Sequence, residues 1–266
     1  MKKVKRLAAW MILVFVVTAA SLTAMAAKKA GEYVPVYGEK YVQQNGSWIP
    51  VGSVSASYKK DGKCTGFSST DSKGLQRGER YTWKGDYITK LVCDYRDSGT
   101  LKYTYNKKHK LVSRTRGLTK YTYRWSGKSA IYSDGNYTEK LAFNKKGQLT
   151  KAVYGTSAYT FSYYKNGNLK KSSSSFAVTN YNSRGDLKSF SYSYLNMNAV
   201  FTYVKDEAGR IKQVNVAYTD RNGAHNAKIV YSKWKKVSRV RNCDAAGTTA
   251  RGSMVTDLLT LGSLFR

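Results

Sequence analysis

Phe143-Asn144-Lys145-Lys146-Gly147-Gln148-Leu149 places an aromatic residue four positions before a glycine and six positions before an aliphatic residue. The same spacing recurs three times, the last time with two residues inserted before the glycine, at Tyr163-Gly167-Leu169, Tyr181-Gly185-Leu187 and Tyr203-Gly209-Ile211. The aliphatic residues follow one another at intervals of 18 to 24 residues. An interval of this length has room for two strands and two tight turns.

Alternating residues beside these glycines predict β-strands. Residues 101–105 read Leu-Lys-Tyr-Thr-Tyr and residues 121–125 read Tyr-Thr-Tyr-Arg-Trp. Successive side chains of a strand point to opposite faces, so one face is aromatic and the other carries Lys, Ser and Thr. Asn166-Gly167 supplies the positive φ that a tight hairpin turn requires. The step from Leu187 to Phe190 changes the parity of the pattern and predicts a β-bulge.

The pattern therefore predicts an all-β fold built as an antiparallel hairpin-repeat meander. A sheet with one apolar face buries that face by curling, by closing into a barrel or by folding into two layers. We expect a curled or barrel-like sheet with an aromatic interior and roughly 14 to 16 strands, because sequential hairpins of similar length pair with their neighbours.

The aromatic, three residues, Gly, one residue, Leu pattern, preceded by Tyr-x-Tyr, resembles the YD or RHS-type β-hairpin repeats of bacterial secreted proteins. The resemblance covers about residues 58–240 and implies a secreted array of β-hairpins. In the long members of the family it implies a shell that encloses a toxin. The position that is usually Asp in the repeat departs from the pattern here and is occupied by Asn106, Arg124, Asn144, Tyr164, Asn182 and Val204.

The two ends of the chain differ from the repeats. Four basic residues precede an apolar run and the small residues Ala24-Met25-Ala26, which predicts a secretory signal peptide over residues 1–26. Residues 27–57 contain both prolines and an Asn-Gly turn signal at 45–46, and because proline cannot donate to a ladder we expect edge or cap strands there. Residues 58–240 form the β-hairpin repeat domain, and residues 241–266 a C-terminal tail or short cap.

The chain is strongly basic. Its formal net charge is +30, and removal of the predicted signal peptide lowers this to +26. A surface this basic attracts polyanions with a steep dependence on salt. We therefore expect a secreted, extracellular or envelope-associated protein that binds an anionic cell-envelope polymer, a glycosaminoglycan or a nucleic acid, without stable membrane insertion. The alternative is that the lysines are solvated residues of strand faces and turns.

Lysines gather at the predicted turns and form three candidate polyanion-binding clusters. They are Lys107, Lys108 and Lys110; Lys145 and Lys146; and Lys233, Lys235 and Lys236. Turns stacked along one rim of a sheet would join them into a basic stripe. Basic residues also alternate with tyrosines, as at Lys102-Tyr103, which suggests stacking of bases or sugars. The alternative is that the tyrosines fill the interior of the curled sheet.

The sequence carries no catalytic motif. We find no Gly-x-Ser-x-Gly, His-Glu-x-x-His, phosphate-binding loop or paired-cysteine zinc spacing. His109 and His225 have no evident partner, and many carboxylates fall in turns, where Asp is favoured by its own backbone hydrogen bonds. We expect a non-enzymatic protein with no cofactor and no metal. The alternative functions are an outer-membrane β-barrel and a glycan-binding or hydrolytic module.

Three cysteines, Cys64, Cys93 and Cys243, allow three disulfide pairings with one thiol left over. The sequence does not choose among these pairings. A disulfide between Cys64 and Cys93 would close a loop of about 28 residues, and a buried free thiol is the equal alternative.

Overall fold

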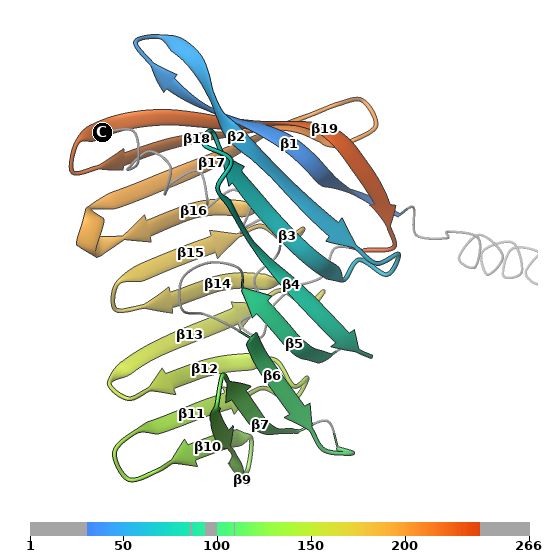
Figure 1. Ribbon diagram of the computed structural model, residues 1–266, viewed down its shortest axis with the longest axis vertical. Helices are drawn as coiled ribbons and strands as arrows, with labels where there is room; N and C mark the ends of the chain where they lie inside the picture. The colour runs from blue at the N-terminus through green and yellow to red at the C-terminus, as the bar shows by residue number, and fades with distance from the viewer. Residues whose placement is uncertain (1–30, 86, 94–99, 109, 240–266) are drawn as a thin grey trace, which may run out of the picture.

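The computed structural model describes residues 31–85, 87–93, 100–108 and 110–239, and these form one 19-stranded antiparallel sheet (Figure 1). The first nine strands are β1 (Glu32–Gln44), β2 (Ser47–Tyr58), β3 (Cys64–Asp71), β4 (Gln76–Lys84), β5 (Tyr87–Cys93), β6 (Thr100–Tyr105), β7 (Leu111–Arg116), β8 (Thr119–Thr122) and β9 (Arg124–Ser126). The next seven are β10 (Ser129–Ser133), β11 (Thr138–Phe143), β12 (Leu149–Tyr154), β13 (Ser157–Tyr163), β14 (Leu169–Ser174), β15 (Ala177–Tyr181) and β16 (Leu187–Tyr192). The 3-10 turn η1 (Ser193–Leu195) precedes β17 (Met197–Lys205), β18 (Ile211–Asp220) and β19 (Gly223–Val237). The predicted signal peptide and C-terminal tail lie outside the described residues.

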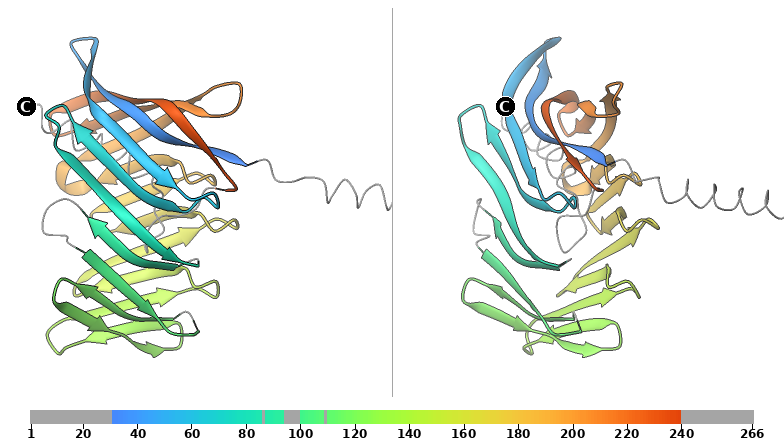
Figure 2. Two further views of the ribbon diagram at one scale, coloured as in Figure 1. Left: turned by 45° about the vertical axis from the view of Figure 1, so that its right-hand side comes forward. Right: turned by 90° about the vertical axis from the view of Figure 1, so that its right-hand side faces the viewer.

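The sheet closes into a barrel-like shape. Strands that follow each other in the chain pair as neighbours, and β19 pairs back onto β1. β8 and β9 continue one path, since β8 pairs with β7, β9 pairs with β10, and the amide of Tyr123 between them donates to Val112 O at 2.8 Å. Two layers of strands result, joined above by β1 and β19 and below by β7 to β11 (Figure 2). This confirms the predicted all-β, barrel-like fold, although the 19 strands exceed the roughly 14 to 16 expected from the hairpin spacing.

The strand β1 is not an edge strand, in contrast to the expectation drawn from its proline. It pairs with β19 on one side and with β2 on the other. Pro35 stands beside a register shift against β19, and Pro50 stands beside one against β1. Bulges are positions where a strand tolerates a residue that cannot donate. The predicted hairpin at Asn45-Gly46 is confirmed, with positive φ angles of 49° and 81°.

The repeated sequence unit is a five-residue turn followed by a β-bulge. Phe143 pairs with Leu149, while the preceding Ala142 pairs with Lys151, so one extra residue is accommodated after the aliphatic position. Within the turn, the Oδ1 atom of Asn144 accepts hydrogen bonds from the backbone amides of Lys146 and Gln148, at 2.9 and 3.0 Å. An Asx side chain that satisfies backbone donors in this way is a common means of stabilising a turn. Asn144 and Gln148 therefore shape the turn, and Lys145 and Lys146 are its exposed residues.

The same turn and bulge occur six times in the described part of the chain. The paired residues that close the turns are Tyr58 and Cys64, Tyr105 and Leu111, Phe143 and Leu149, Tyr163 and Leu169, Tyr181 and Leu187, and Lys205 and Ile211. The bulge predicted after Leu187 is confirmed. The last unit contains no insertion, because Lys205 rather than Tyr203 takes the position that is aromatic elsewhere. The turn spacing is thus uniform, and the aromatic residue is the variable part.

Aromatic side chains of the neighbouring strand donate hydrogen bonds to the backbone carbonyl of the aliphatic residue or cysteine at five of these bulges. A bulge interrupts the ladder, so a buried carbonyl there needs another donor. Tyr and Trp supply that donor while their rings fill the interior. The five bonds are Trp83 Nε1 to Cys64 O (2.6 Å), Trp125 Nε1 to Leu111 O (2.7 Å), Tyr163 OH to Leu149 O (2.7 Å), Tyr203 OH to Leu187 O (2.6 Å) and Trp234 Nε1 to Ile211 O (2.9 Å).

Apolar side chains fill the inside of the barrel, and most outward side chains are polar, although Val200, Val204 and Val230 are exposed. On β17, Met197, Ala199 and Phe201 are buried while the residues between them are exposed. Two apolar clusters result, a large one between the two layers and a smaller one around Tyr123 and Leu141. The aromatic interior predicted from the alternation is therefore confirmed.

One of the three cysteines can be placed in this core. Cys64 is a buried free thiol whose sulfur lies 3.3 Å from the carbonyl oxygen of Gly66. Its burial fits the free-thiol alternative considered from the sequence. The side chain of Cys93 and all of Cys243 lie outside the described residues.

The barrel has two different rims because the strands alternate in direction. We call the rim that carries all six five-residue turns rim A, formed by residues 59–63, 106–110, 144–148, 164–168, 182–186 and 206–210. Rim B carries the connections at the other ends of the strands, including Asn45-Gly46 and η1. Rim A lies on the right-hand side of Figure 1 and faces the viewer in the right-hand view of Figure 2.

We expect the variant Tyr203→Phe to lower the free energy of unfolding by about 1–3 kcal/mol. The substitution removes the hydroxyl that donates to the Leu187 carbonyl, while the ring keeps its volume. Urea denaturation followed by circular dichroism measures the change. Tyr194→Phe removes a hydroxyl from an exposed side chain on rim B and is the matched control. Equal effects of the two substitutions would contradict the role given to the bulge hydrogen bond.

Candidate functional site

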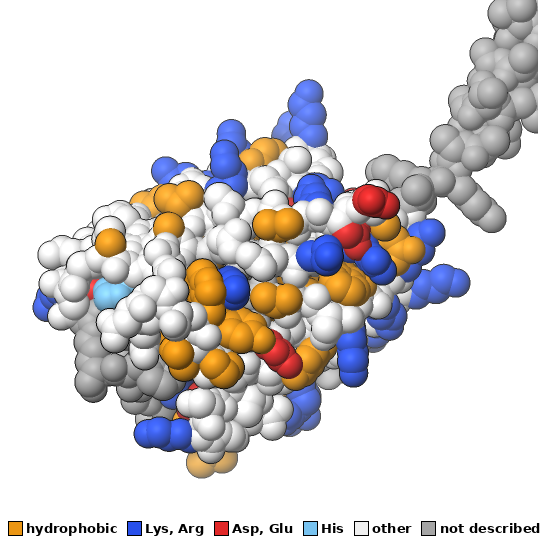
Figure 3. All heavy atoms as spheres, turned by 90° about the horizontal axis from the view of Figure 1, so that it is seen from above, with side chains coloured by type: hydrophobic (Ala, Val, Ile, Leu, Met, Phe, Trp, Pro, Cys, Tyr) orange, Lys and Arg blue, Asp and Glu red, His pale blue; other side chains and the backbone are white. Residues whose placement is uncertain are grey.

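Rim A concentrates positive charge. Its six five-residue turns contain eleven Lys or Arg residues and four Asp or Glu residues. The described turns of rim B contain two Lys or Arg residues and one Asp or Glu residue. Lys and Arg side chains also outnumber acidic ones on the face of the barrel seen from above (Figure 3). The five-residue turns share one rim because an even number of strands separates each from the next, with β8 and β9 counted as one. The topology thus gathers the lysines of distant turns into one edge of the barrel.

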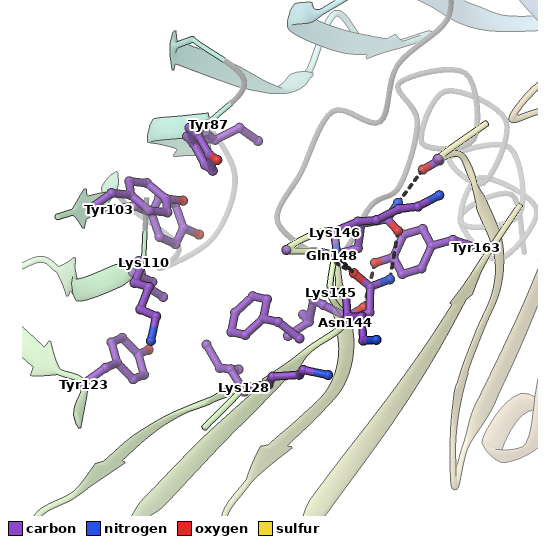
Figure 4. A pocket seen from close by; sticks show the side chains of 18 of the residues that line it. Tyr87, Tyr103, Lys110, Tyr123, Lys128, Asn144, Lys145, Lys146, Gln148 and Tyr163 are labelled. Atoms are coloured by element: carbon purple, nitrogen blue, oxygen red, sulfur yellow. Dashed lines mark hydrogen bonds between the residues drawn. The ribbon is translucent and has the colours of Figure 1, made fainter. Parts of the chain in front are cut away.

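A cavity of about 980 Å³ opens at rim A between the two layers. One wall comes from β4 to β7 and the other from β9 to β13, and Figure 4 shows labelled side chains of both walls facing the space between them. Its cationic lining residues are Lys108, Lys110, Arg114, Lys128, Lys145, Lys146 and Arg239. Aromatic side chains, among them Tyr103, Tyr123 and Trp125, line it more deeply. The mouth of the barrel is therefore basic at its entrance and aromatic below.

The three predicted lysine clusters all lie on the side of rim A, and two of them face each other. Lys108 and Lys110 line one wall of the cavity, and Lys145 and Lys146 line the other. Lys107 is exposed in the same turn as Lys108. The structure therefore brings together residues that are about 35 positions apart in the sequence.

The third cluster lies apart from the cavity, at the end of β19. The ammonium of Lys233 lies 5.5 Å from the ring centroid of Tyr37, and that of Lys236 lies 5.9 Å from the centroid of Tyr33. Lys235 donates a hydrogen bond to the carbonyl of Tyr58. These contacts hold the cluster against β1 and β2, so part of its donor capacity is used within the protein.

Three cationic residues of the mouth, Arg114, Lys128 and Arg239, were not predicted from the sequence. Lys128 lies in the short turn between β9 and β10, and its carbonyl accepts from the amide of Phe143 at 2.9 Å, which holds it beside the turn of Lys145. Arg114 is on a strand and points inward, where the alternation predicts apolar residues. In the sequence, the signal for Arg114 is a charged residue at an inward position of a strand. Lys128 and Arg239 carry no comparable signal, because neither belongs to a local lysine cluster.

The alternation of lysine and tyrosine does not produce a stacking surface. Lys102 is exposed, whereas Tyr103 next to it packs against the core clusters, because neighbours in a strand occupy opposite faces. Trp125, which lines the cavity, contacts two other side chains. Phe143 stacks on it with the centroids 5.4 Å apart, and the ammonium of Lys110 lies 4.7 Å from its centroid. The aromatic rings are therefore mainly part of the core.

A buried charged cluster lies deep in the cavity wall. Glu139, whose side chain is 1% exposed, accepts from Arg114 Nη2 and from the hydroxyl of Tyr123, both at 2.8 Å. Burial raises the pKa of Glu139, and Arg114 and the Tyr123 hydroxyl oppose that rise. Burial and the nearby Glu139 raise the pKa of Tyr154, which reaches about 12. The arrangement neutralises the one acidic side chain among the described residues that line the cavity.

The histidine that the structure describes is paired with a carboxylate across a turn. His225, for which the sequence indicated no partner, lies 3.1 Å from the carboxylate of Asp220, across the β18–β19 turn on rim B. His109 lies outside the described residues. Among the residues that the structure describes, no cluster of three His, Cys, Asp or Glu side chains could hold a metal ion. The same part of the chain contains no helix long and apolar enough to cross a membrane.

Comparisons with known proteins give a distant likeness. No protein-family model matches the chain, and no curated protein matches it. Among solved structures, a porin-like protein from Bacteroides uniformis is similar, with a TM-score of 0.33 and 15% sequence identity over 74% of this chain and 97% of that chain. The resemblance to YD or RHS-type repeats stays a prediction.

We expect Arg114→Met to lower the free energy of unfolding at pH 7 by about 3 kcal/mol, because it leaves Glu139 buried without its cation. The pKa of Glu139 should then rise further above its ordinary value. Stability that a group with a raised folded pKa contributes is present at low pH and lost as pH rises. The deficit should therefore be largest near pH 7 and shrink toward about pH 4.5, where the carboxyl becomes protonated.

Urea denaturation of wild type and variant at about pH 7 and about pH 4.5 measures this dependence. Arg124→Met, on the outward face of β9, is the matched control and should change stability little at either pH. A deficit of Arg114→Met that is the same at both pH values would contradict the role assigned to the Glu139 pair.

Proposed function

We propose that this protein is a secreted, non-enzymatic β-barrel that binds anionic polymers of a cell envelope or host surface through rim A. The observation that carries the proposal is the segregation of charge between the rims, with eleven basic residues in the five-residue turns of rim A and two in the described turns of rim B. Solvated lysines without a function would be expected on both rims. A basic edge with lysines on two opposing walls attracts extended polyanions strongly at low ionic strength.

An outer-membrane β-barrel is the second candidate, which the closed antiparallel sheet with hairpin connections favours. Two observations support a barrel in water instead. Strands β12 to β16 contain five to seven residues, whereas a membrane-spanning strand needs about 9 to 11. Most outward positions on these strands are polar, as at Lys171, Asn180 and Ser189, whereas the lipid-facing band of a membrane barrel is apolar.

We expect the chain without residues 1–26 to stay in solution without detergent and to elute as a compact particle in size-exclusion chromatography. Circular dichroism of that fraction should show β-structure. Aggregation in buffer that is reversed by detergent, or spontaneous insertion into lipid vesicles with β-structure, would favour the outer-membrane alternative.

We expect retention on a heparin column that is lost steeply with salt, and we expect it to depend on rim A. The triple variant Lys108→Gln, Lys145→Gln, Lys146→Gln should elute at clearly lower salt than wild type, because three exposed cations of one site are removed. With duplex DNA as ligand, the slope of log affinity against log salt should fall by about 0.9 for each phosphate that the variant no longer neutralises.

The matched control removes the same charge from outward strand positions, as Lys140→Gln, Lys151→Gln, Lys171→Gln. This control should elute close to wild type if position on rim A matters. Co-elution of the two triple variants would show that only net charge is sensed, and elution of wild type at low salt would overturn the proposal.

A further inference from the structure

The cavity at rim A has an excess of positive charge that the described residues lining it do not balance. Seven of the described lining residues are cationic, and Glu139 is the one acidic residue among them. Arg114 already neutralises Glu139, so the lysines of the two walls face each other across the opening with no carboxylate of the described lining between them. Like charges that share a concave, partly desolvated space repel each other more than on an open surface. The complement of this cavity is a multiply charged anion.

The size of the cavity indicates a short ligand segment. A volume of about 980 Å³ is at the upper end of sites that enclose small molecules. The space can hold a few sugar-sized rings, and longer polymer would continue along the exposed turns of rim A. A discrete site with one ligand per barrel is therefore expected, in addition to diffuse attraction along the rim.

The aromatic lining offers poor platforms for nucleic-acid bases. Base stacking needs open ring faces, whereas Phe143 stacks on Trp125 and the ammonium of Lys110 lies over the same ring. Tyr87 and Tyr105 pack against each other, with their centroids 5.2 Å apart. These contacts occupy ring surface that stacking would need.

The lining is also too apolar for a ligand that consists of anionic groups alone. Ile88, Leu111, Leu141 and Phe143 line the cavity together with the lysines. Inorganic polyphosphate has no apolar surface to place against them. An acidic sugar has both kinds of surface, because its ring carries C–H groups and hydroxyls while its carboxylate or sulfate groups carry the charge. Buried aliphatic side chains beside convergent polar groups suit such an amphipathic ligand.

We infer that the mouth of rim A binds a short acidic oligosaccharide, with its carboxylate or sulfate groups between the wall of Lys108 and Lys110 and the wall of Lys145 and Lys146. The inference rests on the proposed function and narrows its ligand to one chemical class. Lys128 belongs to the same site, because the Phe143 amide holds its turn next to the second wall. The ammonium of Lys110 lies on Trp125, so an anion that draws Lys110 away should change the fluorescence of that ring.

Titration of the full barrel with defined tetrasaccharides, by calorimetry and tryptophan fluorescence, tests the inference. One arm uses a heparin-derived tetrasaccharide, which carries sulfates, and another uses a hyaluronan tetrasaccharide, which carries only carboxylates. We expect saturable binding of at least one of them with one ligand per chain. The double variant Lys128→Gln, Lys146→Gln should weaken that binding about tenfold or more, the reduction expected from removing charge-assisted hydrogen bonds.

The control is the double variant Lys140→Gln, Lys151→Gln, which removes the same charge from the outward face and should bind within about twofold of wild type. All four substituted lysines are exposed, and circular dichroism checks that each variant keeps its fold. Short oligothymidylate and polyphosphate of matched charge complete the comparison. We expect both to bind more weakly than the preferred tetrasaccharide.

Failure of the inference and failure of the proposed function give different results. Salt-sensitive retention on heparin without saturable tetrasaccharide binding would overturn the discrete site and leave the basic rim in place. Absence of both would overturn the proposed function as well. Equal or tighter binding of oligothymidylate or polyphosphate would refute an acidic sugar as the ligand, and equal weakening by the two double variants would refute the mouth as its location.

Discussion

The hydrogen bond from an aromatic side chain to a bulge carbonyl is the interaction on which the barrel depends. Each five-residue turn is followed by a bulge. A bulge interrupts the ladder, so a backbone carbonyl in the apolar interior needs a donor from elsewhere. Tyr163 and Leu149 illustrate the solution, because the phenol that fills the core also satisfies the carbonyl of the neighbouring strand. In each of the five bonds given above, with β8 and β9 counted as one strand, the donor lies on the adjacent strand, so the bond ties one hairpin to the next. Tyr and Trp therefore serve this sheet better than Phe.

The uniform turn has a second consequence, which is the separation of charge. Strands alternate in direction, so turns separated by an even number of strands all lie on one rim. A lysine in any of these turns is then placed on the same edge as lysines of other turns, whatever their distance in the sequence. Positive charge at the mouth opposes close packing of the rim, yet Lys63, Lys110 and Arg210 each lie over a Trp ring that donates to a bulge carbonyl. The structural unit and the candidate binding site thus share residues.

Residues of the turn divide into structural and exposed positions. Asn144 closes the turn, and Gln148 Nε2 donates to the carbonyl of Gly167 in the next turn at 3.0 Å. Lys145 and Lys146 are left as the exposed pair. The aromatic and lysine alternation suggested a mixed stacking surface, and the pleat of the strand sends these two kinds of side chain to opposite faces instead.

Local features of this protein follow from its sequence alone. Alternating residues decide which face of a strand is aromatic, and a glycine after an Asx residue decides where the chain turns, because both effects act within a few residues. The closure of β19 onto β1 and the meeting of the walls of Lys108 and Lys145 depend on the twist and bulges accumulated over many strands. No local pattern encodes that sum. The tertiary structure alone therefore decided that the turns of Lys108 and Lys145 face each other across one cavity, and that β1 is an interior strand and not an edge.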